Sequence, residues 1–595
     1  MGKEKYGGVR LVWHRRDLRL HDNFLYQGLS GRYDCTKKCV SLYIFDVKGY
    51  FTPQPSTCCP ERYDSVFCGP HFARVCIEAV EALRASLHAI DGELLVRVTS
   101  DEVDSISIVT DIATRVGATE IFYSEEPGSY EACLSQRLKE YYCDKVDSSI
   151  HLHSDLGYTL FHPDDLPYGA QQWQQLAHPK QKHKKKRGPS NKESLNHLEN
   201  VAADRRHDLN KFSLVNVTPQ RFTGMCHIMG DFRRATRSYA QVREPLPSPK
   251  KLLKPNCIGN TVESGEIPRL QQLMTPLLSS LSSRSILGME KDIIKSIVQS
   301  ALDYNEKETS TSCEDGSKFH GGECHALDRL DYFVGRGYSN TARRNLADVG
   351  NNDSSKFSIH LSMGTLSPRT IYVKVRESGN IQSQWIISHL EMRDFFIYNA
   401  FKSGSHLFRQ SGLNVFRKGK RKEISWMSPS EMSKEWKSWI CGTSSLPLVD
   451  AAMKELLATG YCSNRVRQNA ASVLTKDLKI DWRAGAEWFQ FLLIDHCVGA
   501  NWGNWLYFSG IGSDPKNRHF CTVSQALKYD YNAEYVKKWI PNLKSETNLE
   551  ACFRPWDFSS EKRPFINPNS QYTYMDLERL KQTSSIFHKD ENETQ

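Results

Sequence analysis

Hydrophobic and polar positions alternate in blocks along the first quarter of the chain. Four short apolar runs have the length of buried strands: 9–13, 39–46, 93–98 and 119–124. Between the second and third runs, apolar residues recur every three or four positions from Phe72 to Ile90, which predicts an amphipathic helix. Strands separated by helices of this length predict right-handed βαβ units and a parallel sheet. No GxGxxG follows any run, so this Rossmann-like α/β region lacks the dinucleotide-binding fingerprint.

The pattern changes between residues 169 and 320. A compact basic run, KHKKKR at 182–187, is followed by Pro- and Ser-rich stretches and by ETSTSCEDGSKFHGG at 308–322. Such a composition buries little apolar surface, so we predict loop and linker that form an enlarged interdomain connection. The basic run is either a patch for nuclear import or nucleic acid, or a solvated charge run, which is the commoner case.

From residue 321 onward the pattern is helical, with long periodic segments at 384–402 and 445–480. An all-α domain is therefore expected at 321–558, after an α/β domain at 8–168 and the connection at 169–320, with a polar tail at 559–595. Within the helical domain, Asn464, Arg467 and Gln468 share one face at i, i+3, i+4 spacing. Four tryptophans then fall within 24 residues: Trp482, Trp488, Trp502 and Trp505.

Composition narrows the class of protein. A chain of 595 residues exceeds what one core usually organises. The net charge of 78 − 69 = +9 permits an anionic partner such as nucleic acid without requiring one. No apolar run is long enough to span a membrane. The 17 cysteines form no CxxC pair and no secretory signal or clear transit peptide precedes them, so we expect free thiols, no metal site, and a cytoplasmic or nuclear location.

The stretch SNRVRQNAAS…TKDL…IDWR…NWGNWLY resembles the flavin domain of the cryptochrome/photolyase family, and NRxRQN with the Tyr that ends GNWLY is closest to its DASH branch. WHRRDLRLHDN at 13–23, 68–87 and 158–168 extend the resemblance over most of the chain. The resemblance implies a flavin adenine dinucleotide (FAD) cofactor and a methenyltetrahydrofolate antenna in the α/β domain. Glu126, in SEEPGSYE, is the candidate antenna contact; the alternative is a solvated acid at a strand end.

The same resemblance implies the flavin contacts. Segment 351–369 matches the family's diphosphate-binding loop, although taken alone it reads as an N-capped helix. Arg467 and Asp495 match a charge pair beside the flavin ring, and such a pair persists in a buried site only when it is satisfied. The matching positions are Tyr338, Ser354, Ser355, Phe357, Ser358, Arg393, Arg467, Asp495 and Asn501.

A chain of tryptophans is implied as the route by which electrons reach the photoexcited flavin. Trp505 and Trp482 match its first two members. Trp426 is the expected third, with Trp436 as the alternative, because the spacing from Trp426 to Trp439 is longer than expected.

The sequence departs from the family at the pocket for damaged DNA. His389 stands in place of a Glu that bonds the lesion, and Met392 in place of a stacking Trp. Glu391 is nearby in the sequence but cannot take the place of His389, because a helix turns about 100° per residue. Cys497 also stands where an acid is usual. The pocket contacts that remain are Asn464, Arg465, Gln468 and Tyr507.

Two functions follow from the resemblance. The first is a monomeric blue-light photoreceptor that binds DNA, either single-stranded or lesion-containing. The second is a light-driven lyase that splits cyclobutane pyrimidine dimers, mainly in single-stranded DNA. A flavin-free structural relative is a third, minor alternative.

Overall fold

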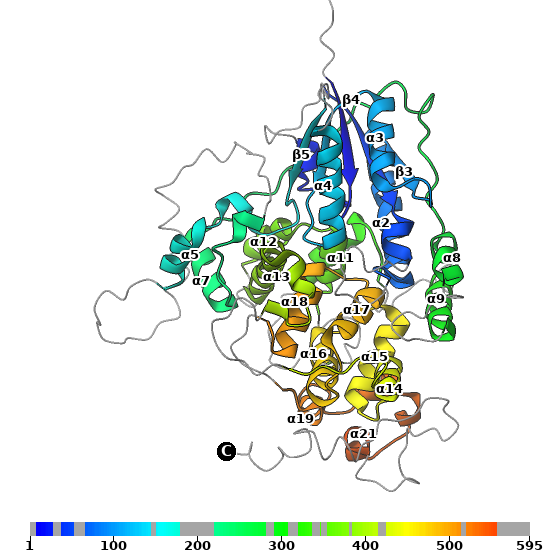
Figure 1. Cartoon of the computed structure of the whole chain (residues 1–595), viewed down its shortest axis with the longest axis vertical. Coiled ribbons are helices and arrows are strands. Elements are labelled where there is room, and N and C mark those ends of the chain that lie inside the picture. The colour runs from blue at the N-terminus through cyan, green and yellow to red at the C-terminus, as the bar shows by residue number, and fades with distance from the viewer. Residues whose placement is uncertain are drawn as a thin grey trace, which may run out of the picture.

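The chain folds into a sheet-containing part and a helical part, which lie at the top and bottom of Figure 1. The computed structural model describes residues 8–27, 37–52, 66–143, 150–178, 219–280, 291–306, 319–335, 346, 354–379, 384–413, 424–512 and 519–555. Tyr338 and the basic run at 182–187 lie outside these residues.

A five-stranded parallel sheet with the strand order β3-β2-β1-β4-β5 forms the first part, which confirms the predicted α/β architecture. Its strands are β1 (Val9–His14), β2 (Lys38–Phe45), β3 (Leu94–Val98), β4 (Ala118–Ser124) and β5 (His151–Asp155). The first four match the apolar runs. β5 was not predicted, because its sequence HLHSD contains no apolar run and its first three residues are not buried.

Three helices cover the sheet: α2 (Pro70–His88), α3 (Ser105–Val116) and α4 (Ser129–Cys143). Pro70 starts α2 with its φ already set for a helix, and the predicted apolar stripe is its buried face. Asp104 caps α3 by accepting a hydrogen bond from the Ser107 amide, and Gly117 ends it in the left-handed conformation. Short helical turns complete this part: α1 (Phe24–Gln27), Val47–Phe51 and Pro163–Asp165.

The connection is more ordered than its composition predicts. It contains α5 (Gly169–Ala177), a 3-10 turn at Pro219–Phe222, α7 (Met229–Tyr239), α8 (Leu270–Ser280) and α9 (Lys291–Glu306). Helix α8 buries Leu273, Met274 and Leu277 and lies beside α2 with α9 (Figure 1). The expectation of a purely loop-like linker is therefore wrong for these segments, because an apolar stripe lies between the Ser- and Pro-rich stretches.

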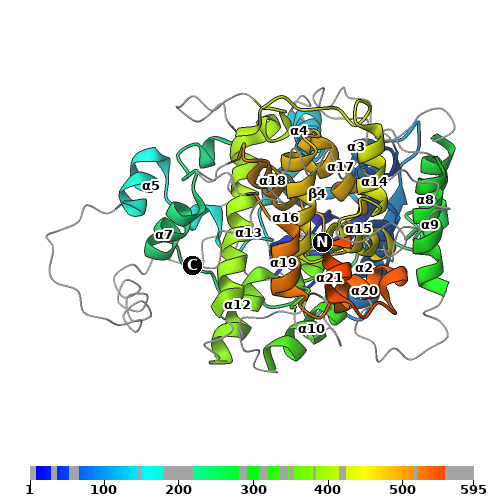
Figure 2. The same ribbon diagram turned by 90° about the horizontal axis from the view of Figure 1, so that it is seen from below.

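Helices form the regular structure of the described part of the chain from 319 onward, as predicted, apart from one isolated bridge between Met427 and Ile480. They are α10 (Glu323–Gly335), α11 (Phe357–Met363), α12 (Pro368–Glu377), α13 (Gln384–Ser403), a 3-10 turn (Gly404–Phe408), α14 (Ser433–Cys441), α15 (Pro447–Thr459), α16 (Asn464–Ser472), a π-helical turn (Val473–Asp477), α17 (Trp482–Leu492), α18 (Val498–Ser509), α19 (Thr522–Tyr529), α20 (Glu534–Trp539), a 3-10 turn (Pro541–Leu543) and α21 (Leu549–Phe553). Seen from below, α13 runs along one side of the central helices α16 and α18 (Figure 2). Helices α13 and α17 both pack against α18.

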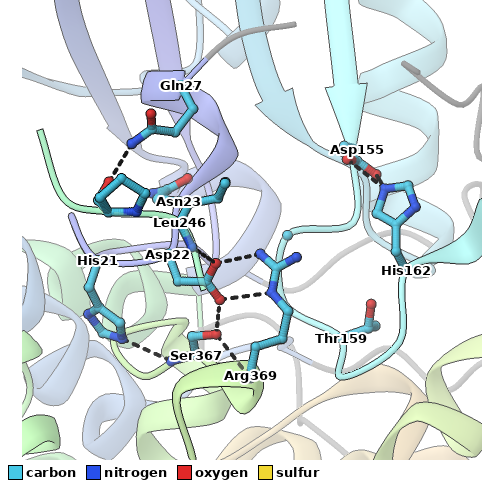
Figure 3. Close-up of polar contacts among 12 residues, drawn as sticks. His21, Asp22, Asn23, Gln27, Asp155, Thr159, His162, Leu246, Ser367 and Arg369 are labelled. Atoms are coloured by element: carbon cyan, nitrogen blue, oxygen red, sulfur yellow. Dashed lines mark hydrogen bonds and ion pairs between the residues drawn. The ribbon is translucent and has the colours of Figure 1, made fainter. Parts of the chain in front are cut away.

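The segment WHRRDLRLHDN fastens the two parts together. The buried Asp22 carboxylate accepts two hydrogen bonds from Arg369, at 2.7 and 2.8 Å, and a third from the Ser367 hydroxyl (Figure 3). The amide of Leu246, in the connection, donates a fourth at 2.8 Å. Asp22 therefore joins the α/β part, the connection and the start of α12.

Among the described segments, no helix is both long and apolar enough to cross a membrane.

Candidate functional site

The predicted charge pair is formed. Arg467, on α16, donates to Asp495, in the turn between α17 and α18, with an Nη2–Oδ2 distance of 2.9 Å. Its Nε donates to the Cys462 carbonyl at 2.7 Å. Burial is the largest single influence on the pKa of Arg467 and lowers it, but the interactions with Asp495, Cys462 and Tyr461 together outweigh burial, so the pKa is raised.

The other carboxylate oxygen of Asp495 is buried and unpaired among the described residues. The Asp495 side chain is only 4% exposed, and its Oδ1 has no hydrogen-bond partner within the described part of the chain. Leaving a buried acceptor unpaired costs about 1–3 kcal/mol, which a ligand N–H would recover. The site therefore fits a group that carries a ring N–H, and the isoalloxazine of FAD is such a group.

Asn501 lies on α18, close behind this turn. Its Nδ2 donates to the Ala486 carbonyl on α17 at 2.9 Å, and the residue is 8% exposed. This bond fixes the orientation of the carboxamide, so Asn501 is a rigid polar group between α17 and α18.

The segment predicted to bind diphosphate, 351–369, lies close to Arg467, because Lys356 and Arg467 both contact the Tyr461 ring. Lys356, at the N-terminus of α11, places its Nζ 4.7 Å from the centre of the Tyr461 ring, and the Arg467 guanidinium lies 5.2 Å from that ring. The Ser362 hydroxyl of α11 donates to the Ile494 carbonyl, next to Asp495, at 3.3 Å. Sequence reasoning missed Lys356 and Tyr461; only the position of Lys356 within the serine-rich segment could have indicated it.

The other predicted flavin contacts have partners within the protein. The Ser354 and Ser355 carbonyls accept hydrogen bonds from Arg329, at 2.5 and 3.0 Å. Arg393, on α13, donates to the carbonyls of Tyr158 and Leu361. Phe357 is buried and Ser358 is exposed.

The predicted tryptophans separate into two groups. The Trp505 ring lies against Trp439 and Phe489, whereas the Trp482 ring lies against Trp502. Trp426 is half-buried at the edge of the same core.

The altered lesion-pocket positions lie on α13. His389 is exposed, and its Nδ1 donates to the Trp385 carbonyl at 2.8 Å, one turn earlier. Met392 is half-buried. Glu391 lies on another face, where it accepts hydrogen bonds from Arg237 at 2.7 and 2.8 Å and pairs with Arg233 at 3.0 Å.

The remaining pocket residues are on α16 and α18. Asn464 is exposed, while Arg465 donates to the Gln468 amide oxygen at 3.0 Å and lies 4.5 Å from the centre of the Tyr529 ring. Tyr507 is half-buried against Phe508, with ring centres 5.1 Å apart. Asn464, Arg465 and Gln468 give α16 a polar, partly exposed face beside Arg467.

A separate cavity of about 60 Å³ lies at the carboxyl ends of β1 and β2, and Glu126 lines it. Strands β2 and β4 lie on opposite sides of β1, so the strand order reverses direction at β1. Open α/β sheets bind ligands at the carboxyl ends of the strands where this reversal occurs. Glu126 is 6% exposed and pairs with Arg15 at 3.3 Å and Arg16 at 3.2 Å. Burial, which outweighs the two guanidiniums, raises its pKa to about 7. The alternative of a solvated acid is therefore wrong.

Comparison with known proteins identifies the family. The model for the FAD binding domain of DNA photolyase matches residues 385–584, and the DNA photolyase model matches 10–197. The chain is 31% identical over 546 residues to cryptochrome DASH of Gloeobacter violaceus, covering 90% of this chain and 85% of that protein. It is 29% identical over 569 residues to cryptochrome DASH of Danio rerio, covering 94% and 88%.

Solved structures agree with this fold. The cryptochrome of Synechocystis superposes with a TM-score of 0.68 at 26% identity, covering 94% of each chain. A class III photolyase of Agrobacterium tumefaciens superposes with a TM-score of 0.65 at 19% identity, covering 99% and 98%, which shows a shared fold only. The chain therefore belongs to the cryptochrome DASH family and is a FAD-dependent blue-light photoreceptor of that type.

Proposed function

We propose that Arg467, Asp495 and Asn501 hold the flavin ring, and that Lys356 and the serine-rich segment at 354–358 face its diphosphate. The observation that carries this proposal is the buried Asp495 Oδ1 beside Arg467, which has no hydrogen-bond partner among the residues that the structure describes. The bound flavin supplies light absorption and one-electron chemistry. The protein supplies a fixed cation, an unpaired buried acceptor and an oriented amide.

Removing the cation tests this assignment. Arg467→Ala leaves Asp495 buried and unpaired, at a cost of about 3–5 kcal/mol, so we expect most of the flavin to be lost. Arg467→Lys keeps the charge and should retain more. Flavin content per chain after gel filtration is the measurement, and full occupancy of the alanine variant would remove the pair from the site.

For the electron route we propose Trp505 as the first donor to the photoexcited flavin, with Trp482 and Trp426 carrying the electron hole toward the surface. Trp505 lies on the same helix as Asn501, one turn further on, and is buried. Trp426 is the partly exposed member. The photoreceptor reading needs this route, because light must change the flavin's redox state.

As antenna we propose methenyltetrahydrofolate, bound at the α/β cavity with Glu126 as its main polar contact. Its pterin N–H groups match a buried carboxylate. Pockets for ligands of this size usually measure about 300–1,000 Å³. The lining side chains must therefore move to admit the folate into a cavity of about 60 Å³. An absorption band in the near ultraviolet, separate from the flavin bands, would support the antenna.

DNA is the proposed partner of the exposed face of α16, with a preference for single strands, bound by a monomer in the cytoplasm or nucleus. Repair of cyclobutane dimers is the second candidate function and is expected to be feeble. The His389 Nδ1–H is bonded to its own helix, and Met392 offers no aromatic platform. Losing base stacking costs about 1–3 kcal/mol and losing a hydrogen bond about 1 more, which together weaken dimer binding about 10- to 1000-fold.

The double variant His389→Glu, Met392→Trp tests this reading. We expect it to increase the light-dependent recovery of thymine absorbance on an ultraviolet-treated oligothymidine. If the unmodified protein already repairs that substrate with near-stoichiometric yield per absorbed photon, the two departures are tolerated and the photoreceptor is also an efficient lyase.

A further inference from the structure

Trp505 belongs to an aromatic cluster whose other members, Phe489, Trp439 and Trp436, lie outside the proposed route through Trp482 to Trp426. Its ring centre lies 5.2 Å from that of Phe489 and 6.2 Å from that of Trp439, both edge to face. Trp439 in turn stacks on Trp436, with ring centres 5.6 Å apart and planes 20° apart. Trp436 and Trp439 come from α14, whereas Trp505 comes from α18.

The predicted second donor lies in a different cluster. The Trp482 ring contacts Trp502 at 5.6 Å, and Trp502 contacts Phe408 at 4.7 Å. Trp505 packs against Gly485, which lies one turn beyond Trp482 on α17: a Cβ on Gly485 would lie 2.3 Å from the Trp505 ring. Trp505 therefore adjoins both clusters, but its ring contact is with Trp439. Electron tunnelling falls exponentially with the distance between ring edges, so this contact favours transfer.

The α14 cluster is closed to water. Trp436 is 1% exposed and Trp439 is 0% exposed. The indole N–H of Trp439 donates to the Ala470 carbonyl at 3.0 Å, and an amide carbonyl is too weak a base to remove that proton. An oxidised indole at Trp439 keeps its proton and its positive charge. Trp426, at the end of the predicted route, is instead partly exposed.

We propose that Trp439 and Trp436 form a second branch of the electron route, which stores the electron hole in the dry interior. This inference rests on the proposed role of Trp505. After the photoexcited flavin has taken one electron from Trp505, one electron passes from Trp439 to Trp505 and then one from Trp436 to Trp439. No bond forms or breaks and no proton moves. The hole returns to the flavin by the reverse steps, because a thiol in solution does not reach it.

Two populations of tryptophan radical follow from the two branches. The population that ends at the partly exposed Trp426 should decay faster when an external thiol is added. The population on Trp439 and Trp436 should be insensitive to the thiol. Transient absorption of the flavin-loaded protein, with and without thiol, resolves the two by their decay rather than by the yield of reduced flavin.

Substitutions by phenylalanine separate the branches. Trp439→Phe should remove the thiol-insensitive population, and Trp482→Phe should remove the thiol-sensitive one. Trp436→Phe leaves Trp439 in place and should shorten the lifetime of the insensitive population, which keeps the proposal testable if Trp439→Phe folds poorly. Trp488→Phe is the matched control, because Trp488 is equally buried but its ring partner is Phe491. It should retain both populations.

Two outcomes distinguish the branch from the role of Trp505. If Trp505→Phe abolishes both populations but Trp439→Phe retains the thiol-insensitive one, the branch is wrong and the role of Trp505 stands. If Trp505→Phe retains both, another residue is the first donor and the proposed function fails at that step. Equal flavin content in every variant is the condition for comparison.

Discussion

The contact between Asp22 and Arg369 should carry much of the stability of the joint between the two parts. The Asp22 side chain is 0% exposed and Arg369 is 5% exposed. Arg369→Met preserves most of the volume of the side chain and removes its charge. Breaking a buried pair in this way costs about 3–5 kcal/mol, because the remaining charge stays buried. The hydrogen bonds from Ser367 and Leu246 remain, so we expect a loss near the lower limit, about 3 kcal/mol.

A chain of this size is not expected to unfold in one step, so the joint is best probed by native-state proteolysis. When opening and closing are fast, cleavage follows the population of the open form. A loss of about 3 kcal/mol then accelerates cleavage about 100-fold, because each 1.36 kcal/mol is a factor of ten.

A matched control lies on the same helix. Lys374 pairs with Asp331 at 2.9 Å, but both side chains are exposed, so Lys374→Met should cost at most about 1 kcal/mol. In the Arg369→Met background, Asp22→Asn removes the buried charge and should recover part of the loss. The reasoning is refuted if Arg369→Met is cleaved no faster than Lys374→Met, or if Asp22→Asn gives no recovery.

Three further predictions concern buried titratable groups. Burial raises the pKa of Glu455 to about 7, so the protonated carboxyl is the form that the fold favours. Its contribution to the free energy of unfolding is complete below about pH 4.5 and is lost as the pH rises to about 7. Glu455→Gln should therefore flatten the dependence of the thermal midpoint on pH over that range, and parallel curves for the two proteins would contradict this. Burial lowers the pKa of His360 to about 3, so the neutral ring stabilises the fold above pH 6.5 and that contribution is lost as the pH falls; its ring resonances in NMR spectra should not shift between pH 7 and 5. Glu126→Gln keeps the shape of the cavity but removes its charge, and should reduce the antenna band while leaving flavin content unchanged, as absorption spectra would measure.

The sequence predicted the elements that can be recognised from the hydrophobic pattern of their own residues. The strands β1 to β4 and helix α2 each carry an apolar run or stripe of their own. The edge strand β5 has its first three residues unburied and forms because β4 offers a free edge, which no local pattern reports. Helix α8 was missed because its stripe of Leu273, Met274 and Leu277 stands among polar residues and includes Pro276.

The candidate site shows the same division. The pairing of Arg467 with Asp495 was predictable, because a charged side chain in an apolar stretch is stable only when an opposite charge or a ligand compensates it. The approach of Lys356 to Tyr461, and that of Trp439 to Trp505, depend on how distant helices pack. The residue types alone do not indicate that Lys356 contacts Tyr461 or that Trp439 contacts Trp505. For the tryptophans, the neighbouring ring determines the route that an electron can take.

The segment WHRRDLRLHDN also connects the two candidate sites. Arg16 pairs with Glu126 in the α/β cavity, and its Nη1 donates to the His496 carbonyl at 2.6 Å, next to Asp495. Six residues further on, Asp22 is bonded to Arg369. Energy transfer between two chromophores depends on their separation and mutual orientation. We therefore expect this segment to act as a rigid spacer: it holds the cavity and the Arg467–Asp495 pair at a fixed distance, and Asp22 prevents the two parts from rotating against each other.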